Sequence, residues 1–376
     1  MKILHTSDWH LGMPAGTDTY EDCQRFFLGQ LYSLIEKEHI EAVICAGDVY
    51  DSSVSNPDAI GIYNEACNKL CLDLGVTFIV IAGNHDGAAR LASCSELLKK
   101  SGLYVSGRIS RDVEPVLLGD GSVAVYPLPF FTKDAVISLY PEKKDSIRSY
   151  EDAVLTVTDN IRETMDSSRF NIAVSHSLTV DAELCESDRA ARIGMMNAVS
   201  KDVFRGFDYT ALGHIHKPQA ITDNIRYSGS PVKYSFGNEE LQSKGVVVID
   251  TEKRENQFFE LPALRGRRTV TDTYENIAAM PASDDYMRIY ITDRYSGPEL
   301  AFEMSERFPH MLELYGKRLE ESADYGLMTI DKVRSMDELQ LMKEFFAEIF
   351  KYEPTPAQVD LFRDALEKAC GEGSEQ

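Results

Sequence analysis

The stretch Lys2-Ile-Leu-His-Thr-Ser-Asp-Trp-His10 begins as a short apolar strand and ends in an aspartate and a histidine. The same order, an apolar run followed by Asp, Asn or His, recurs at four later points of the chain. The five motifs are Asp8-Trp-His10, Gly47-Asp48-Val-Tyr-Asp51, Gly83-Asn-His-Asp86, Ser175-His176 and Gly213-His-Ile-His216. Loops that follow parallel strands meet at one edge of an α/β sheet, so we expect these side chains to share one crevice.

Short apolar runs alternate with longer amphipathic stretches through the first 260 residues or so, which predicts a layered α/β fold. The expected strands are Lys2–Thr6, Ala42–Ala46, Val76–Ala82, Val123–Tyr126, Asn171–Ser175, Tyr209–Leu212 and Val246–Ile249. Helices are expected around Phe26–Ile35 and after Pro57, with faces suited to the core, although a bundle between subunits could use the same faces.

Length and composition bound the class of protein. The chain has 376 residues, 43% of them hydrophobic and 27% charged, which is typical of a soluble protein of two or three domains. It contains no run of 18 apolar residues, and its N-terminus turns polar after Leu4, so we expect no membrane span, no signal peptide and a cytoplasmic location. Seven scattered cysteines without a C-x-x-C pair argue against disulfides and a thiolate zinc site.

The formal net charge of −22 argues against nucleic-acid binding, because phosphate backbones repel such a surface. A DNA-binding function would need compensating cations from metals, a basic patch or a partner. The cluster Arg265-Gly-Arg-Arg268 is the one local counterweight, and it is equally compatible with a solvated linker.

The C-terminal third has a different organisation. A boundary is expected near Leu261-Pro262, followed by a small α+β unit with a strand at Tyr286–Thr292 and a helix at Pro298–Phe308. An apolar stripe then recurs at helical spacing: Met336, Leu339, Met342, Phe345, Phe346, Ile349 and Phe350. Thr355-Pro-Ala-Gln358 predicts a capping box that begins one more helix. Such terminal helices either fold back on their own domain or dock a partner.

The motif residues suit a metal centre. Together Asp, Asn and His suit Mn²⁺, Fe²⁺ or Zn²⁺ better than an all-oxygen Mg²⁺ site. The seven candidate ligands, too many for one ion, are Asp8, His10, Asp48, Asn84, His176, His214 and His216. They suggest two metals about 3.5–4 Å apart. Asp51 and Asp86 are either helix caps or partners that orient metal-bound histidines, and His5, His39 and His310 are expected to be structural.

This ordered set resembles the calcineurin-like metallophosphoesterase superfamily, which implies a β-sandwich core flanked by helices. The resemblance implies one metal held by Asp8, His10, Asp48 and His216, and a second held by Asp48, Asn84, His176 and His214, with Asp48 bridging. It implies a catalytic role for His85 beside the phosphate, which suits proton transfer near neutral pH. Two Mn²⁺ ions per chain are expected, with Mg²⁺, Fe²⁺ or Zn²⁺ as other occupants.

Longer stretches resemble the SbcD family of nuclease subunits in DNA double-strand-break repair. They are His5-Thr-Ser-Asp-Trp-His-Leu-Gly12, Ala46–Asp51, Gly83–Leu91, Phe207–Gln219, Tyr227–Pro231 and Tyr234–Gly237. The resemblance implies a nuclease domain at 1–260, a capping, DNA-binding domain at 261–330 and a helical module at 331–376. In that layout, residues 336–370 grip the coiled coil of an SbcC-like ATPase subunit, and a homodimer of this chain sits within a heterotetramer.

The implied activities are 3′→5′ exonuclease cleavage of double-stranded DNA ends and endonuclease cleavage of single strands and hairpins, gated by ATP. A stand-alone phosphodiesterase for small molecules such as cyclic nucleotides and a catalytically silent scaffold subunit are the alternatives. The segment Leu178–Val199, with Glu186-Ser-Asp-Arg189, departs from the family pattern, as does Met13. Neither is expected to touch a metal ligand.

Overall fold

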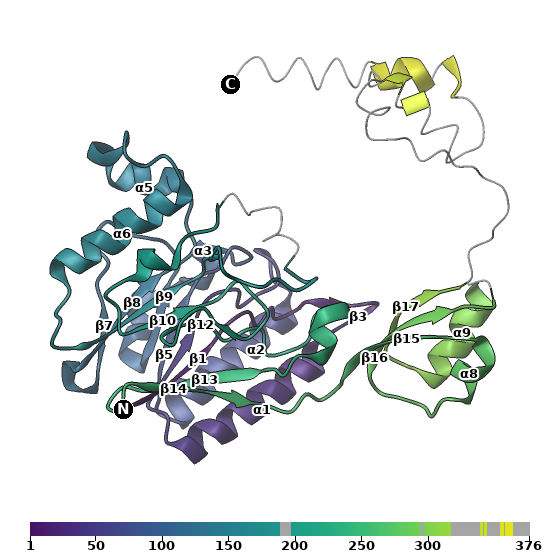
Figure 1. Cartoon of the computed structure of the whole chain (residues 1–376), viewed down its shortest axis with the longest axis horizontal. Helices are drawn as coiled ribbons and strands as arrows, with labels where there is room; N and C mark the ends of the chain where they lie inside the picture. Colours follow the sequence, from purple (N-terminus) through teal and green to yellow (C-terminus); the bar gives the residue numbers. More distant parts are fainter. Residues whose placement is uncertain are drawn as a thin grey trace. The chain divides into compact units, whose positions relative to one another are not determined.

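The computed structural model describes residues 1–188, 197–294, 297–316, 339–340, 342–343, 354–356 and 358–363. The chain divides into two compact units, Met1–Lys317 and Arg318–Gln376. Figure 1 shows the course of the chain, with the five motifs in its purple to teal part. The boundaries at residues 260 and 330 stay predictions.

Two six-stranded sheets form the core of the first unit (Figure 1). The spatial order of the first is β14 (Glu255–Glu260), β13 (Gly245–Asp250), β1 (Lys2–Thr6), β4 (Ala42–Cys45), β5 (Thr77–Ile81) and β6 (Leu103–Ser106). The second runs β11 (Gln219–Ala220), β12 (Ile225–Tyr227), β10 (Tyr209–Leu212), β9 (Phe170–Ser175), β8 (Val123–Leu128) and β7 (Val116–Leu118). The central strands of both sheets are parallel. Antiparallel strands lie at one edge of the first sheet, whose other edge strand β6 is parallel, and at both edges of the second sheet.

The sheets pack face to face and helices cover their outer faces, which confirms the layered α/β prediction. Ile3, Ile44 and Ile79 of the first sheet form one apolar cluster with Val125 and Ile172 of the second. Helices α1 (Glu21–Glu38) and α2 (Pro57–Asn68) pack on the other face of the first sheet. Helices α5 (Lys133–Leu139) and α6 (Tyr150–Thr164) pack on the other face of the second. Central strands are therefore buried on both faces, which explains their continuous apolar sequences.

His5 lies between the two sheets, as expected of a structural residue. Its ring is fully buried, with Nδ1 3.1 Å from the Tyr209 hydroxyl and Nε2 3.2 Å from the Leu212 carbonyl oxygen. Because both ring nitrogens have partners in the opposite sheet, His5 links the two layers near the edge that carries the motifs.

A smaller sheet follows the sandwich. Its strands β15 (Arg267–Asp272), β16 (Tyr286–Ile291) and β17 (Met311–Tyr315) are all parallel. Helices α8 (Tyr274–Ala279) and α9 (Pro298–Arg307) connect them and share an apolar cluster with the sheet. The predicted strand at Tyr286 and helix at Pro298 are present. The arrangement is α/β where α+β was expected, because the sequence signalled neither β15 nor β17.

The arginine cluster is built into the fold, neither a linker nor a free basic patch. Arg267 is buried, with its guanidinium carbon 4.4 Å from the Phe236 ring centroid and 5.6 Å from that of Tyr286. Arg265 pairs with Asp284 at 3.1 Å. Arg268 pairs with an aspartate as well. The three guanidinium groups are therefore paired with carboxylates or packed on aromatic rings of the same unit.

The described part of the second unit contains the predicted capping box. The Thr355 N–H donates to Gln358 Oε1 at 2.8 Å, and the Gln358 N–H donates to Thr355 Oγ1 at 3.4 Å. Leu339 and Met342 of the apolar stripe are described, and the rest of the stripe lies outside the described residues. No helix in the described residues is long and apolar enough to cross a membrane. All six cysteines among the residues that the structure describes are free thiols.

Candidate metal centre

The five motifs follow β1, β4, β5, β9 and β10, and the structure brings their side chains together. One group of potential ligands consists of Asp8, His10 and His216, and a second of Asp48, His176 and His214. Within each group the donor atoms lie within 4.8 Å of one another. Asn84 joins the second group, with its Oδ1 3.0 Å from His176 Nε2 and 2.9 Å from His214 Nδ1. All seven predicted ligands therefore meet at one edge of the sandwich.

In the first group, two imidazole nitrogens face each other. His10 Nε2 and His216 Nε2 are 3.0 Å apart, and both rings are buried. Asp8 accepts hydrogen bonds from the His214 N–H at 2.9 Å and from the Ser7 hydroxyl at 2.5 Å, which fix its carboxylate beside them. Two imidazole nitrogens that converge beside a buried carboxylate are the donor set that a divalent cation takes.

Asp48 lies between the two groups. Its Oδ2 is 3.2 Å from His176 Nε2 and 3.7 Å from His10 Nε2. Its other oxygen, Oδ1, accepts the His85 backbone N–H at 2.9 Å. One carboxylate oxygen is thus held by the protein while the other faces both sets of imidazoles, which fits the predicted bridging role.

Four of the seven candidate ligands have a left-handed backbone. The φ values are 53° for Asp8, 43° for His10, 48° for Asp48 and 94° for His214. Such conformations cost about 1–3 kcal/mol each in non-glycine residues and persist where surrounding structure imposes them. Here the motif loops constrain one another, because the Asp8 N–H donates to the Gly47 carbonyl and the His10 N–H to the Asp48 carbonyl, both at 3.0 Å. The strain aims side chains from consecutive loops at the same space.

Two motif glycines allow the close approach of these loops. A Cβ atom on Gly83 would lie 2.1 Å from Asp48 Oδ1, and one on Gly47 would lie 2.4 Å from His176 Nδ1. Gly47 also has a φ of +93°, which side-chain-bearing residues rarely adopt. Any larger residue at either position would push a candidate ligand out of place.

Burial and mutual attraction set the protonation of the site. Burial disfavours the charged form of His176, but the nearby Asp48 carboxylate outweighs it and raises the pKa of His176 to about 9. Burial likewise disfavours the Asp48 carboxylate, yet the charge and hydrogen bond of His176 hold the pKa of Asp48 below its ordinary value. Burial and the charge of His176 lower the pKa of His214 to about 3. Without metal, the site thus keeps the Asp48 carboxylate ionised and the His214 imidazole neutral, whereas His176 carries a proton that a bound cation would displace.

His85 lies beside the ligands. Its Nδ1 is 2.7 Å from the Asp51 carbonyl oxygen, a group that can only accept, so Nδ1 carries a proton. The His85 ring packs edge to face on His10, with centroids 4.9 Å apart. His85 also forms a third possible ligand group with His10 and Asp51. Its predicted catalytic role stays a prediction.

Asp86 ties two motif loops together. Its carboxylate accepts the N–H groups of Gly83 at 2.8 Å, Tyr50 at 2.9 Å and Val49 at 3.2 Å. These contacts match neither role open from the sequence, a helix cap or a partner of a metal-bound histidine, because Asp86 instead orients the backbone of two ligand loops. The Asp51 carboxylate lies 3.5 Å from His10 Nδ1, beside a ligand candidate as well.

Sequence reasoning missed several residues that hold His10 and His216. Gln24 Nε2 donates to the His10 carbonyl at 2.7 Å, and the Tyr234 ring packs edge to face on both histidines. Ser187 Oγ lies 2.8 Å from His216 Nδ1, and the His216 N–H donates to the Asp188 carboxylate at 3.1 Å. The expectation that the Leu178–Val199 segment touches no ligand is therefore wrong. Serine and aspartate in an irregular loop give no spacing signal that could have revealed this contact.

Comparison with known proteins identifies the family of this chain. Residues 1–218 match the calcineurin-like phosphoesterase family. A protein of Staphylococcus epidermidis, named as the SbcD component of the nuclease SbcCD, is 30% identical over 375 residues, which cover 97% of this chain and 98% of that protein. Its namesake in Staphylococcus saprophyticus is 28% identical, with full coverage of both chains. A solved structure described as a novel archaeal phosphodiesterase aligns with a TM-score of 0.32 at 14% identity, over 69% of this chain and 100% of its own. The chain belongs to the calcineurin-like phosphoesterase family and, within it, to the SbcD family of SbcCD nuclease components.

Proposed function

We propose that this chain is the metal-dependent DNA nuclease subunit of an SbcCD-like complex. The observation that carries the proposal is the pair of ligand groups around Asp48. Two relatives that align over nearly the whole chain are also named as nuclease subunits. The activities we assign are 3′→5′ exonuclease cleavage of duplex ends and endonuclease cleavage of single strands and hairpins, gated by ATP hydrolysis in the partner.

The donor set fits two divalent cations, and we propose Mn²⁺. Asp8, His10, Asp48 and His216 would hold one ion, and Asp48, Asn84, His176 and His214 the other. The facing nitrogens of His10 and His216, 3.0 Å apart, support the first assignment. The convergence of His176 Nε2 and His214 Nδ1 on one Asn84 oxygen supports the second. When bound, such ions polarise a phosphodiester and make water a better nucleophile at neutral pH.

The residues of the chain position the candidate ligands and supply a proton. The Gly47 and Gly83 loops and Asp86 fix the Asp48 carboxylate, so that little reorganisation is needed when a phosphate arrives. Since His85 Nδ1 donates to the Asp51 carbonyl, the nitrogen that exchanges a proton with substrate is Nε2. We assign His85, in the form that carries a proton on both ring nitrogens, the transfer of the Nε2 proton to the departing oxygen of the phosphodiester, which leaves the neutral Nδ1–H imidazole.

The rest of the chain supplies assembly in this proposal. Residues 261–330 would cap the DNA, and residues 336–370 within the 331–376 module would dock a coiled-coil ATPase subunit. A homodimer of this chain within a heterotetramer and a cytoplasmic location complete the assignment. The ATPase would also supply the positive surface that a chain of net charge −22 lacks.

The experiment is a cleavage assay. End-labelled linear duplex DNA and bis-p-nitrophenyl phosphate are incubated with the purified chain, with and without Mn²⁺ and the ATPase subunit, beside an Asp48→Ala control. We expect Mn²⁺-dependent shortening of DNA that the substitution abolishes. Hydrolysis of the small diester without DNA cleavage, even with the ATPase present, would instead identify a small-molecule phosphodiesterase. Hydrolysis of neither would identify a scaffold subunit.

A further inference from the structure

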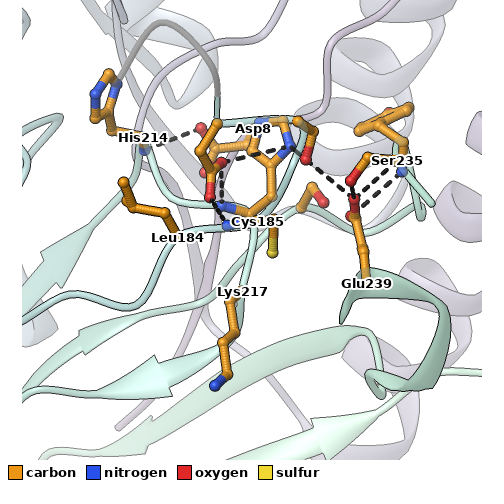
Figure 2. A network of polar contacts seen from close by, with 12 residues as sticks. Asp8, Leu184, Cys185, His214, Lys217, Ser235 and Glu239 are labelled. Atoms are coloured by element: carbon orange, nitrogen blue, oxygen red, sulfur yellow. Dashed lines mark hydrogen bonds and ion pairs between the residues drawn. The ribbon is translucent and has the colours of Figure 1, made fainter. Parts of the chain in front are cut away.

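A buried ion pair lies behind His216, on the side away from His10. Lys244 Nζ is 2.6 Å from Glu239 Oε1, and the two side chains are 2% and 0% exposed. Lys244 also donates to the His216 carbonyl oxygen at 2.8 Å. Figure 2 shows Glu239 at the end of a chain of polar contacts that reaches the metal-ligand loop. Burying such a pair is costly, so its persistence calls for a physical role.

Within the described residues, every polar contact of the Glu239 carboxylate is with a donor. Its Oε2 accepts from Ser187 Oγ at 3.0 Å, from the Ser235 N–H at 2.8 Å and from Ser235 Oγ at 2.5 Å. Its Oε1 accepts from Lys244 Nζ and from the Tyr234 N–H at 3.2 Å. A protonated carboxyl group would give up the charge attraction of the Lys244 ammonium group, 2.6 Å away in a buried site. Glu239 is therefore ionised and acts only as an acceptor.

The proton positions along this chain of contacts follow from the donor count. Ser187 has one hydroxyl hydrogen, and the Glu239 carboxylate takes it. The Ser187 oxygen can then only accept from His216 Nδ1, 2.8 Å away, so His216 carries its proton on Nδ1. The neutral imidazole is left with a lone pair on Nε2, the atom that faces His10.

We propose that Glu239 and Ser187 are positioning residues that hold His216 in its Nδ1–H tautomer and so prepare Nε2 as a metal ligand. This inference rests on the proposed metal centre and adds the mechanism by which one of its ligands is made ready. Lys244 keeps the carboxylate ionised and fixes the His216 backbone from one side, while Asp188 accepts the His216 N–H from the other. Partners of this kind raise the basicity of a ligating histidine and fix its ring.

The test compares matched serine substitutions in the full-length chain. Ser187→Ala removes the acceptor of His216 Nδ1 but leaves the ion pair intact, and Ser187→Thr restores a hydroxyl. Ser230→Ala is the control, because Ser230 accepts from Lys244 at 3.0 Å and donates to the Val232 carbonyl in the same buried network. Mn²⁺ binding to each metal-free variant is titrated by the free-ion electron paramagnetic resonance signal, and thermal unfolding without metal verifies the fold.

We expect Ser187→Ala to weaken the binding of one Mn²⁺ equivalent by about 10–100-fold. Ser187→Thr should restore the affinity and Ser230→Ala should leave it unchanged. Unchanged affinity in Ser187→Ala, or an equal loss in Ser230→Ala, would overturn the tautomer mechanism while the metal centre stands. A wild-type chain that binds no Mn²⁺ would refute the metal centre itself. Glu239→Gln, which keeps the shape but presents an amide, should weaken the same equivalent.

Discussion

Alanine at Gly83 should disable the metal centre without unfolding the chain. The added Cβ would lie 2.1 Å from Asp48 Oδ1 and 2.4 Å from the Asp48 backbone nitrogen, against an ordinary contact of at least 3.4 Å. The carboxylate must therefore move by about 1.3 Å, and the strand ends must also separate by about 1.0 Å, because the backbone nitrogen does not move with the side chain. Since Asp48 faces both ligand groups, this shift affects both proposed metals together.

The expected magnitudes follow from that displacement. A misplacement of about 1 Å in an active site can cost on the order of 100-fold in rate. Overpacking one methyl group typically costs ~1–3 kcal/mol of stability, which a domain stable by ~5–15 kcal/mol survives. We therefore expect Gly83→Ala to remain folded at 25 °C and to lose at least about 100-fold in Mn²⁺-dependent hydrolysis.

The assay measures hydrolysis of bis-p-nitrophenyl phosphate and Mn²⁺ affinity together with thermal unfolding. Gly61→Ala is the matched control, because Gly61 lies in α2 and a Cβ there meets nothing within 4 Å. That control should keep full activity and gain roughly 0.5–1 kcal/mol from helix propensity. If Gly83→Ala retained wild-type hydrolysis and affinity, the position of Asp48 would not limit the reaction and the reasoning would be refuted.

Three further predictions concern buried charge and bound metal. Burial lowers the pKa of His5 to about 3 in the folded chain. As pH falls below 6.5, the unfolded chain therefore protonates His5 before the folded chain does, and the free energy of unfolding decreases. His5→Gln should remove about 2 kcal/mol of the loss in urea-unfolding free energy between pH 8 and pH 5, and an unaltered pH dependence would contradict this. Lys244→Met leaves Glu239 buried without its cation, so the free energy of unfolding measured by chemical denaturation should fall by about 3–5 kcal/mol. A fall of less than about 1 kcal/mol would show that the ion pair does not stabilise the fold. Mn²⁺ at 100 times its dissociation constant should add about 2.7 kcal/mol to the unfolding free energy for each bound ion, seen as a higher melting temperature that chelation reverses. Asp48→Asn should abolish this shift, and its persistence would place the bound ion elsewhere.

The sandwich was predictable where strands are buried on both faces. Lys2–Thr6 and Tyr209–Leu212 are strands with the predicted bounds, because continuous apolar runs of that length leave little alternative. The edge strand β14, Glu255–Glu260, was missed because its sequence is largely polar and none of its residues is buried. The strand β15 was missed because its arginines indicated a surface segment, although Arg267 is packed among aromatic rings. In both cases tertiary contacts, which local sequence does not encode, decide the structure.

The site residues also divide into those that the sequence predicts and those that it does not. The seven candidate ligands and His85 were found because chemically distinctive residues end consecutive strands, and strand order alone brings them together. Ser187 and Glu239 were not found, because a serine in a loop and a glutamate in a short 3-10 helix are common on any surface. Their function depends on a donor and acceptor count that only the three-dimensional contacts supply.

The most direct test of the central claim is the location of bound manganese. Crystals of the chain grown with Mn²⁺ would be measured at the manganese absorption edge, and the anomalous difference map would locate the ions. The account predicts two peaks that share Asp48 as a ligand, one reached by His10 and His216 and the other by His176 and His214. A single peak, no peak, or peaks away from Asp48 would contradict it.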